Sequence, residues 1–106
     1  MYLYLVQLMA RIVPNAMPGK TRLFRLFLKD FVLQSDTVDV RGRYDLIYRV
    51  PDVRESVAFN LICFGLYEEA TIKTIVSLLP SGGVFLDGVA NIGSISLPIA
   101  RMRPDV

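Results

Sequence analysis

The chain contains no histidine and only one cysteine, Cys63, among its 106 residues. Without histidine, these residues cannot form a histidine-dependent catalytic triad, zinc site or proton shuttle. A single cysteine excludes an intramolecular disulfide and a cysteine metal cluster. Because Cys63 stands in an apolar run, we expect it to be a small buried hydrophobic residue.

Charged residues are also scarce, at 21% of the chain, whereas hydrophobic residues make up 53%. This composition excludes a disordered chain and predicts a packed core. The net charge is +2, and residues 1–50 hold eight Lys/Arg against four Asp/Glu. That excess is too small for a nucleic-acid footprint, so we expect no nucleic-acid partner.

The apolar stretch at residues 1–13 has no basic segment before it, and its one charge, Arg11, lies near its end. This order differs from that of a secretory signal, and the stretch is too short to span a bilayer. We therefore expect a cytoplasmic protein.

The first half of the chain predicts two helices, over residues 2–13 and 20–33, and a β-hairpin over residues 37–50. The second helix has an apolar face and a basic side formed by Lys20, Arg22, Arg25 and Lys29. A core-facing helix with a solvated basic rim is favoured over a membrane-surface helix, so we expect no membrane contact. In the hairpin, Gly42 is expected to take a positive φ at the turn.

The second half predicts helices over residues 54–64, 68–79 and 95–102, with Gly65 ending the first of them. Pro98 is tolerable only near the first turn of the last helix. Val84, Phe85 and Leu86 form a short, continuously apolar run. Such a run predicts a strand buried on both faces.

Residues 84–93 combine this expected strand with an acid at its end, Asp87, and a turn of small residues. Ligands of open α/β sheets bind beyond the carboxyl ends of the strands. Gly88 and Gly93 have the spacing of a phosphate-binding loop, but the lysine that must follow is missing. A dinucleotide fingerprint would need glycine at position 90, where Ala90 stands.

The string VFLDGVANIGSISLPIA, at residues 84–100, resembles the first motif of FkbM-type methyltransferases, written D-V-G-A-N-x-G. One helix upstream, residues 65–68 (Gly-Leu-Tyr-Glu) are similar to the G-x-Y-E element of that family. The hairpin end at residues 48–51 resembles its lead-in. The resemblance covers residues 41–105, and its motifs are specific in combination rather than singly.

This resemblance implies a Rossmann-like α/β fold that binds S-adenosylmethionine and transfers its methyl group, usually to a hydroxyl of a sugar or natural product. Asp87 would interact with the amino-acid end of the cofactor, and Glu68 would lie near the same pocket. The turn beneath the cofactor would comprise Gly88, Ala90, Asn91 and Gly93.

In this chain the order of Gly88 and Val89 is reversed relative to the family, which places glycine second after the acid. A β-branched residue resists positive φ, so Val89 is expected to strain the turn and weaken cofactor binding. Alternatively, Asp87 only caps the turn and Glu68 only complements the dipole of its helix.

We expect residues 1–64 to form a helical and hairpin lead-in, and residues 65–106 to begin the S-adenosylmethionine-binding domain. In the family, the ribose-binding acid stands at the end of the next strand. No such strand is expected within these 106 residues, so the sheet is expected to be incomplete. The chain would then be a truncated N-terminal portion without methyl transfer of its own. The alternative is a non-enzymatic α+β interaction module that uses the basic helix at 20–33. The residues do not identify the methyl acceptor or the oligomeric state.

Overall fold

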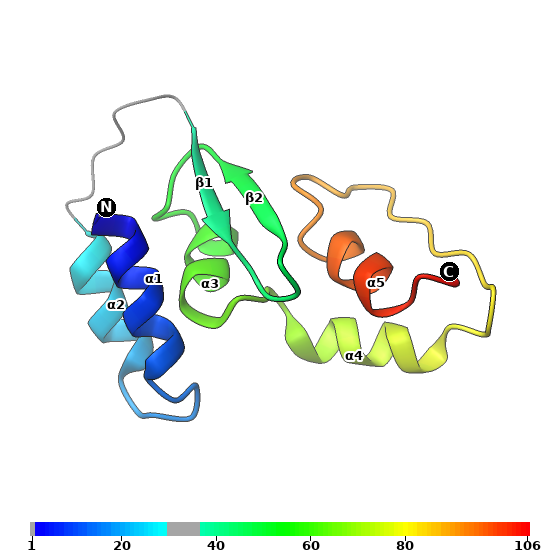
Figure 1. Ribbon diagram of the computed structural model, residues 1–106, viewed down its shortest axis with the longest axis horizontal. Helices are drawn as coiled ribbons and strands as arrows, with labels where there is room; N and C mark the ends of the chain where they lie inside the picture. Colours follow the sequence, from blue (N-terminus) through cyan, green and yellow to red (C-terminus); the bar gives the residue numbers. More distant parts are fainter. Residues whose placement is uncertain (1, 30–36) are drawn as a thin grey trace.

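The computed structural model describes residues 2–29 and 37–106 (Figure 1). A mixed α/β architecture is confirmed in these ranges, with a sheet that consists of two antiparallel strands. In chain order the elements are α1 (Tyr2–Ile12), α2 (Lys20–Leu28), β1 (Val38–Arg41), β2 (Ile47–Val50), α3 (Ser56–Phe64), α4 (Glu69–Leu78) and α5 (Ser96–Met102).

The elements form two hydrophobic clusters (Figure 1). The larger cluster joins α1, α2, the hairpin and α3, and its centre includes Phe24, Tyr48 and Phe59. The smaller cluster lies between α4 and α5, around Leu66, Ile72 and Ile99. Figure 1 shows α1 and α2 at one end of the molecule and the α4–α5 pair at the other, with the hairpin between them.

The two predicted N-terminal helices are present as α1 and α2. α1 buries Leu3, Val6 and Ala10, which recur at helical spacing and face α3. α2 covers the first part of the predicted helix at 20–33. The end of that prediction, from residue 30 onward, lies outside the described residues.

Lys20 differs from the prediction, because it is buried instead of lying on a solvated basic rim. Its Nζ donates hydrogen bonds to the carbonyl oxygens of Ala10 at 2.8 Å and Val13 at 3.0 Å, and to Oδ1 of Asn15 at 2.7 Å. The last carbonyls of a helix have no partner within it. Lys20 therefore satisfies carbonyls at the end of α1 from the start of α2. Its burial lowers the pKa of this ammonium group.

The hairpin forms with Val40 opposite Tyr48, but Gly42 does not have the predicted positive φ. The left-handed residues of the turn are Tyr44, with φ 60°, and Asp45, with φ 57°. Gly42 is needed for a different reason. A Cβ there would lie 2.7 Å from the Tyr48 ring and 2.9 Å from the carbonyl oxygen of Gly65.

α3 begins and ends as local capping rules require. The carboxylate of Glu55 accepts hydrogen bonds from the backbone N–H groups of Val57 and Ala58. Gly65 ends the helix in the left-handed conformation, with φ 77°, which confirms the predicted stop.

Cys63 is buried as expected, and burial raises the pKa of its thiol to about 11.

The two C-terminal helices are confirmed, with Pro98 in the first turn of α5. The strand predicted at 84–86 is wrong: these residues belong to no strand, and Val84 is 88% exposed. A strand requires a neighbour for its backbone hydrogen bonds, and the sheet of the described residues contains only β1 and β2. In Figure 1 the segment is part of a long loop that runs back from α4 to α5.

None of the helices in the described ranges has the length and hydropathy required to cross a membrane.

Replacing Lys20 with methionine tests the cap at the end of α1. We expect Lys20→Met to lower the free energy of unfolding by about 2–3 kcal/mol, because it removes charge-assisted hydrogen bonds and leaves buried carbonyls unpaired. The matched control is Lys29→Met on the exposed side of α2, which should change stability by less than about 0.5 kcal/mol. Urea denaturation measures both. Equal stabilities would show that Lys20 does not cap α1.

The buried Tyr48 predicts a loss of stability at high pH. Its hydroxyl has no hydrogen-bond partner among the described residues, and burial raises its pKa from 10.0 to about 12. The folded state therefore keeps this proton after the unfolded chain has lost it. Stability from this group is complete below pH 10 and falls as the pH rises towards 12.

Tyr48→Phe should remove this part of the pH dependence and change stability at neutral pH by less than about 1 kcal/mol. The Cys63 thiol contributes a similar loss that begins near its ordinary pKa of 9.0. The measured quantity is therefore the difference between the two proteins in thermal unfolding from pH 9 to 12. Parallel curves would contradict the burial of a protonated phenol.

Candidate functional site

The candidate site is the loop from Gly83 to Ile95. In its first part, exposed and packed side chains alternate as they do in a strand. Phe85 packs into the cluster between α4 and α5, whereas its neighbours Val84 and Leu86 are exposed. Side chains that alternate with a period of two are the pattern of a strand with one covered face. The segment thus has the side-chain arrangement of a strand without the backbone pairing of one.

Asp87 follows this segment and ties the loop to α5. Its carboxylate accepts a hydrogen bond from the Ser96 hydroxyl at 2.5 Å and from the backbone N–H of Val89 at 3.3 Å. The second contact spans two residues and forms an Asx turn. Asp87 therefore caps the turn, which was the alternative expectation for this residue. An ionised carboxylate has about four acceptor positions, so two further donors can still be bound.

Ala90, Asn91 and Gly93, three of the residues that the motif would place beneath the cofactor, form a turn. The backbone N–H of Gly93 donates to the carbonyl of Ala90 at 2.8 Å. Asn91, with φ 52°, and Gly93, with φ 79°, are left-handed. Asparagine and glycine are the residues that adopt this conformation most readily. A Cβ on Gly93 would also lie 2.9 Å from Cγ of Leu97, so a larger residue would have to displace that side chain.

The order of Gly88 and Val89, which is reversed relative to the family, does not strain the turn, contrary to the expectation. Among the described residues, Val89 is not one of those with positive φ, and its side chain is 91% exposed. The left-handed positions lie further along, at Asn91 and Gly93, so the steric objection to valine does not apply. Gly88 is open, with no atom within 4 Å of a Cβ built on it.

Glu68 is exposed and left-handed, with φ 54°, and its side chain makes no capping hydrogen bond to α4. The acid that forms ion pairs at the start of α4 is Glu69, and the sequence did not indicate its contact with Arg43. Its Oε1 lies 2.8 Å from Nη1 of Arg43 and 3.0 Å from Nζ of Lys73. The hydrogen bond from Arg43 is the main reason that the pKa of Glu69 is lowered.

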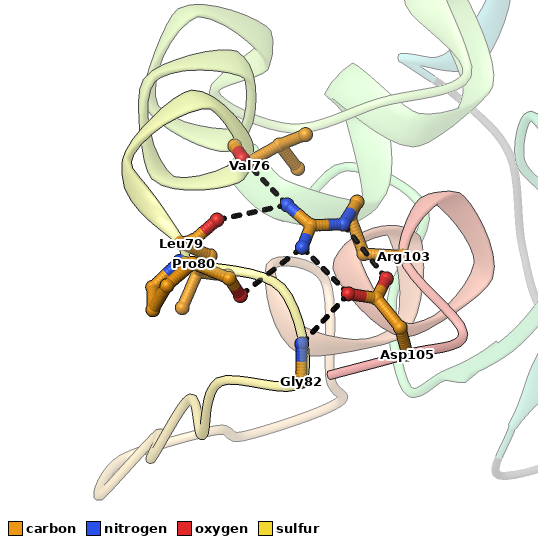
Figure 2. Close-up of polar contacts among 6 residues, drawn as sticks. All are labelled: Val76, Leu79, Pro80, Gly82, Arg103 and Asp105. Atoms are coloured by element: carbon orange, nitrogen blue, oxygen red, sulfur yellow. Dashed lines mark hydrogen bonds and ion pairs between the residues drawn. The ribbon is translucent and has the colours of Figure 1, made fainter.

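A second missed residue, Arg103, holds the beginning of the loop (Figure 2). Its guanidinium donates to the carbonyl oxygens of Val76, Leu79 and Pro80 at 3.1, 3.0 and 3.2 Å. It also forms a two-point ion pair with Asp105, which lowers the pKa of that carboxyl group. Asp105 in turn accepts from the N–H of Gly82 at 3.0 Å. Residues after α5 therefore fix the end of α4.

A cavity of about 460 Å³ lies apart from this loop, between the end of α1 and the hairpin turn. Three arginines line it, namely Arg11, Arg41 and Arg43. They are opposed by Asp45 and by the carbonyl ends of α1 and α3, whose dipoles are negative there. The cavity therefore has no clear preference for anions.

In residues 2–29 and 37–106, no three potential His, Cys, Asp or Glu ligands come together to hold a metal. Comparison with known proteins returned no match to a family model, a curated protein or a solved structure.

Arg103→Gln tests whether this side chain holds the loop. We expect a lower free energy of unfolding, because three carbonyls and Asp105 lose a charged donor. Faster amide hydrogen exchange should appear in the last turn of α4 and at Gly82. Arg49→Gln, which breaks the exposed pair with Asp39, is the control and should have little effect. Unchanged exchange in α4 would exclude the anchoring role.

Proposed function

We propose that this chain is the front part of an S-adenosylmethionine-dependent methyltransferase of the FkbM type. The cofactor would lie on the turn from Asp87 to Gly93. The observation that carries the proposal is the geometry of this turn: an acid with free acceptor positions, followed by left-handed Asn91 and Gly93.

The layering around the turn supports a Rossmann-like arrangement. α4 and α5 pack together and cover one side of residues 84–86 through Phe85. Val84 and Leu86 leave the other side open, where neighbouring strands would lie in a parallel sheet. In such a sheet, Asp87 would stand at the carboxyl end of the strand, where open α/β sheets bind their ligands.

The residues of the turn fit the cofactor chemically. The amino-acid end of S-adenosylmethionine carries an ammonium group, and Asp87 is a half-buried carboxylate with acceptor positions to spare. Gly88 leaves the backbone open to close approach by a ligand. The Ser96 hydroxyl fixes the carboxylate, so the cofactor would meet an oriented acceptor.

The reaction would be transfer of a methyl group to a hydroxyl of a small molecule. Such a displacement depends chiefly on positioning the donor and the acceptor. The role of this chain would be to bind and orient the donor. No residue is assigned here to bind the acceptor or to take its proton.

Titration of the isotopically labelled chain with S-adenosylmethionine tests this proposal by NMR. We expect amide shifts confined to residues 87–95, and no methyl transfer. Binding should be weaker than micromolar, because one turn supplies less than the roughly 8 kcal/mol that micromolar affinity requires. Asp87→Ala should reduce the shifts at least about tenfold at equal ligand concentration, which corresponds to one charged hydrogen bond.

Two controls make the result specific. Asp39→Ala removes an exposed acid on the hairpin and should leave the shifts unchanged. ATP shares the adenosine group but lacks the amino-acid end, so it should not perturb residue 87. The proposal fails if residues 87–95 do not respond to S-adenosylmethionine, or if Asp87→Ala responds as the unmodified chain does.

A further inference from the structure

The outer face of α1 is apolar and exposed, although α1 already buries its other face in the core. Leu5, Leu8, Met9 and Ile12 recur at helical spacing and lie opposite Leu3, Val6 and Ala10. Ile12 is 75% exposed and Tyr4, beside this stripe, is 60% exposed. α1 is therefore apolar on both sides, which a helix at the edge of a protein is not expected to be.

The charges within α1, α2 and their connection have a single sign, although Asp45 of the hairpin turn lines the cavity beside Arg11. Residues 2–29 contain five Lys/Arg and no Asp/Glu. Lys20 is buried, so the cations at the surface are Arg11, Arg22, Arg25 and Lys29. On α2, Leu26 is 68% exposed and lies four residues after Arg22 and three before Lys29, so these cations flank it on the helix surface. Figure 1 shows α1 and α2 side by side at one end of the molecule.

We propose that this α1–α2 face, formed by the exposed residues of 4–29, binds the surface of a membrane that contains anionic phospholipid. Apolar side chains would enter the boundary between headgroups and acyl chains, and the cations would meet the phosphates. Tyr4 is of the residue type that favours membrane interfaces. α1 is 11 residues long and would lie in the plane of the membrane rather than cross it.

The charge pattern favours an anionic membrane over other binding partners for this face. A second copy of the chain on the same face would place cations against cations, at a cost. Nucleic acid would meet the cations but would leave the apolar stripe of α1 exposed to water. An anionic bilayer satisfies both features at once. The residue pattern of 20–33 alone predicted no membrane contact, and the exposed face of α1 is what leads to the present proposal.

The inference does not depend on methyltransferase activity, and its test uses only the 106-residue chain. Cosedimentation is measured with two kinds of vesicle: phosphatidylcholine alone, and equal parts phosphatidylcholine and phosphatidylserine. Binding is expected to the mixed vesicles only, and to weaken as salt is added. Arg22→Gln with Lys29→Gln should lower the partition coefficient roughly 25-fold, at about fivefold for each cation removed.

Leu8→Gln with Ile12→Gln should lower it on the order of tenfold, because these residues supply the apolar contact. Controls of the same chemistry lie on α4 at the other end of the molecule: Leu78→Gln, which is 77% exposed, and Lys73→Gln. Both should bind like the unmodified chain, and circular dichroism checks that every variant is folded.

Three results would overturn the proposal. One is equal binding to both vesicles, and another is binding that the α4 variants weaken as much as the α1–α2 variants do. The third is absence of binding to the mixed vesicles. A concentration-dependent dimer that Leu8→Gln and Ile12→Gln abolish would then assign the face to a second copy.

Discussion

The backbone N–H of Arg43 donates to the carbonyl oxygen of Gly65 at 2.8 Å, and this hydrogen bond joins the hairpin turn to the end of α3, just before α4 begins. It is possible only because Gly42 has no side chain to separate the hairpin turn from the end of α3. The same turn contacts both C-terminal helices. Arg43 pairs with Glu69 at the start of α4, and Arg101 of α5 donates to the carbonyl of Tyr44. The hairpin turn therefore connects the two hydrophobic clusters.

A related constraint governs the ends of the helices. The last carbonyls of α1 and α4 receive their partners from cations that lie elsewhere in the chain, Lys20 and Arg103. A cation is favourable there because a helix carries partial negative charge at its C-terminus. Each cation also holds two helices together. Lys20 joins the start of α2 to the end of α1, and Arg103 joins the residues after α5 to the end of α4. Capping and tertiary arrangement are thus achieved by the same side chains.

The two proposed functions occupy separate parts of the molecule. The turn at 87–93 belongs to the α4–α5 end, whereas the α1–α2 face lies at the other end (Figure 1). The molecule extends about 44 Å along its longest axis. A membrane bound to the α1–α2 face would therefore leave the turn accessible to a soluble cofactor. Neither proposal requires the other.

The sequence by itself determined the helices, the hairpin and the turn of the candidate site, because their signals are local. Apolar periodicity marks each helix, Gly65 ends α3, and Asn91 and Gly93 suit left-handed positions. Tertiary structure alone decided the burial of Lys20, the need for glycine at position 42, and the contacts of Asp87 with Ser96 and of Glu69 with Arg43. Each of these depends on atoms brought close by folding. The apolar run at 84–86 shows the limit: composition favours a strand, but a strand exists only where another backbone is present to pair with it.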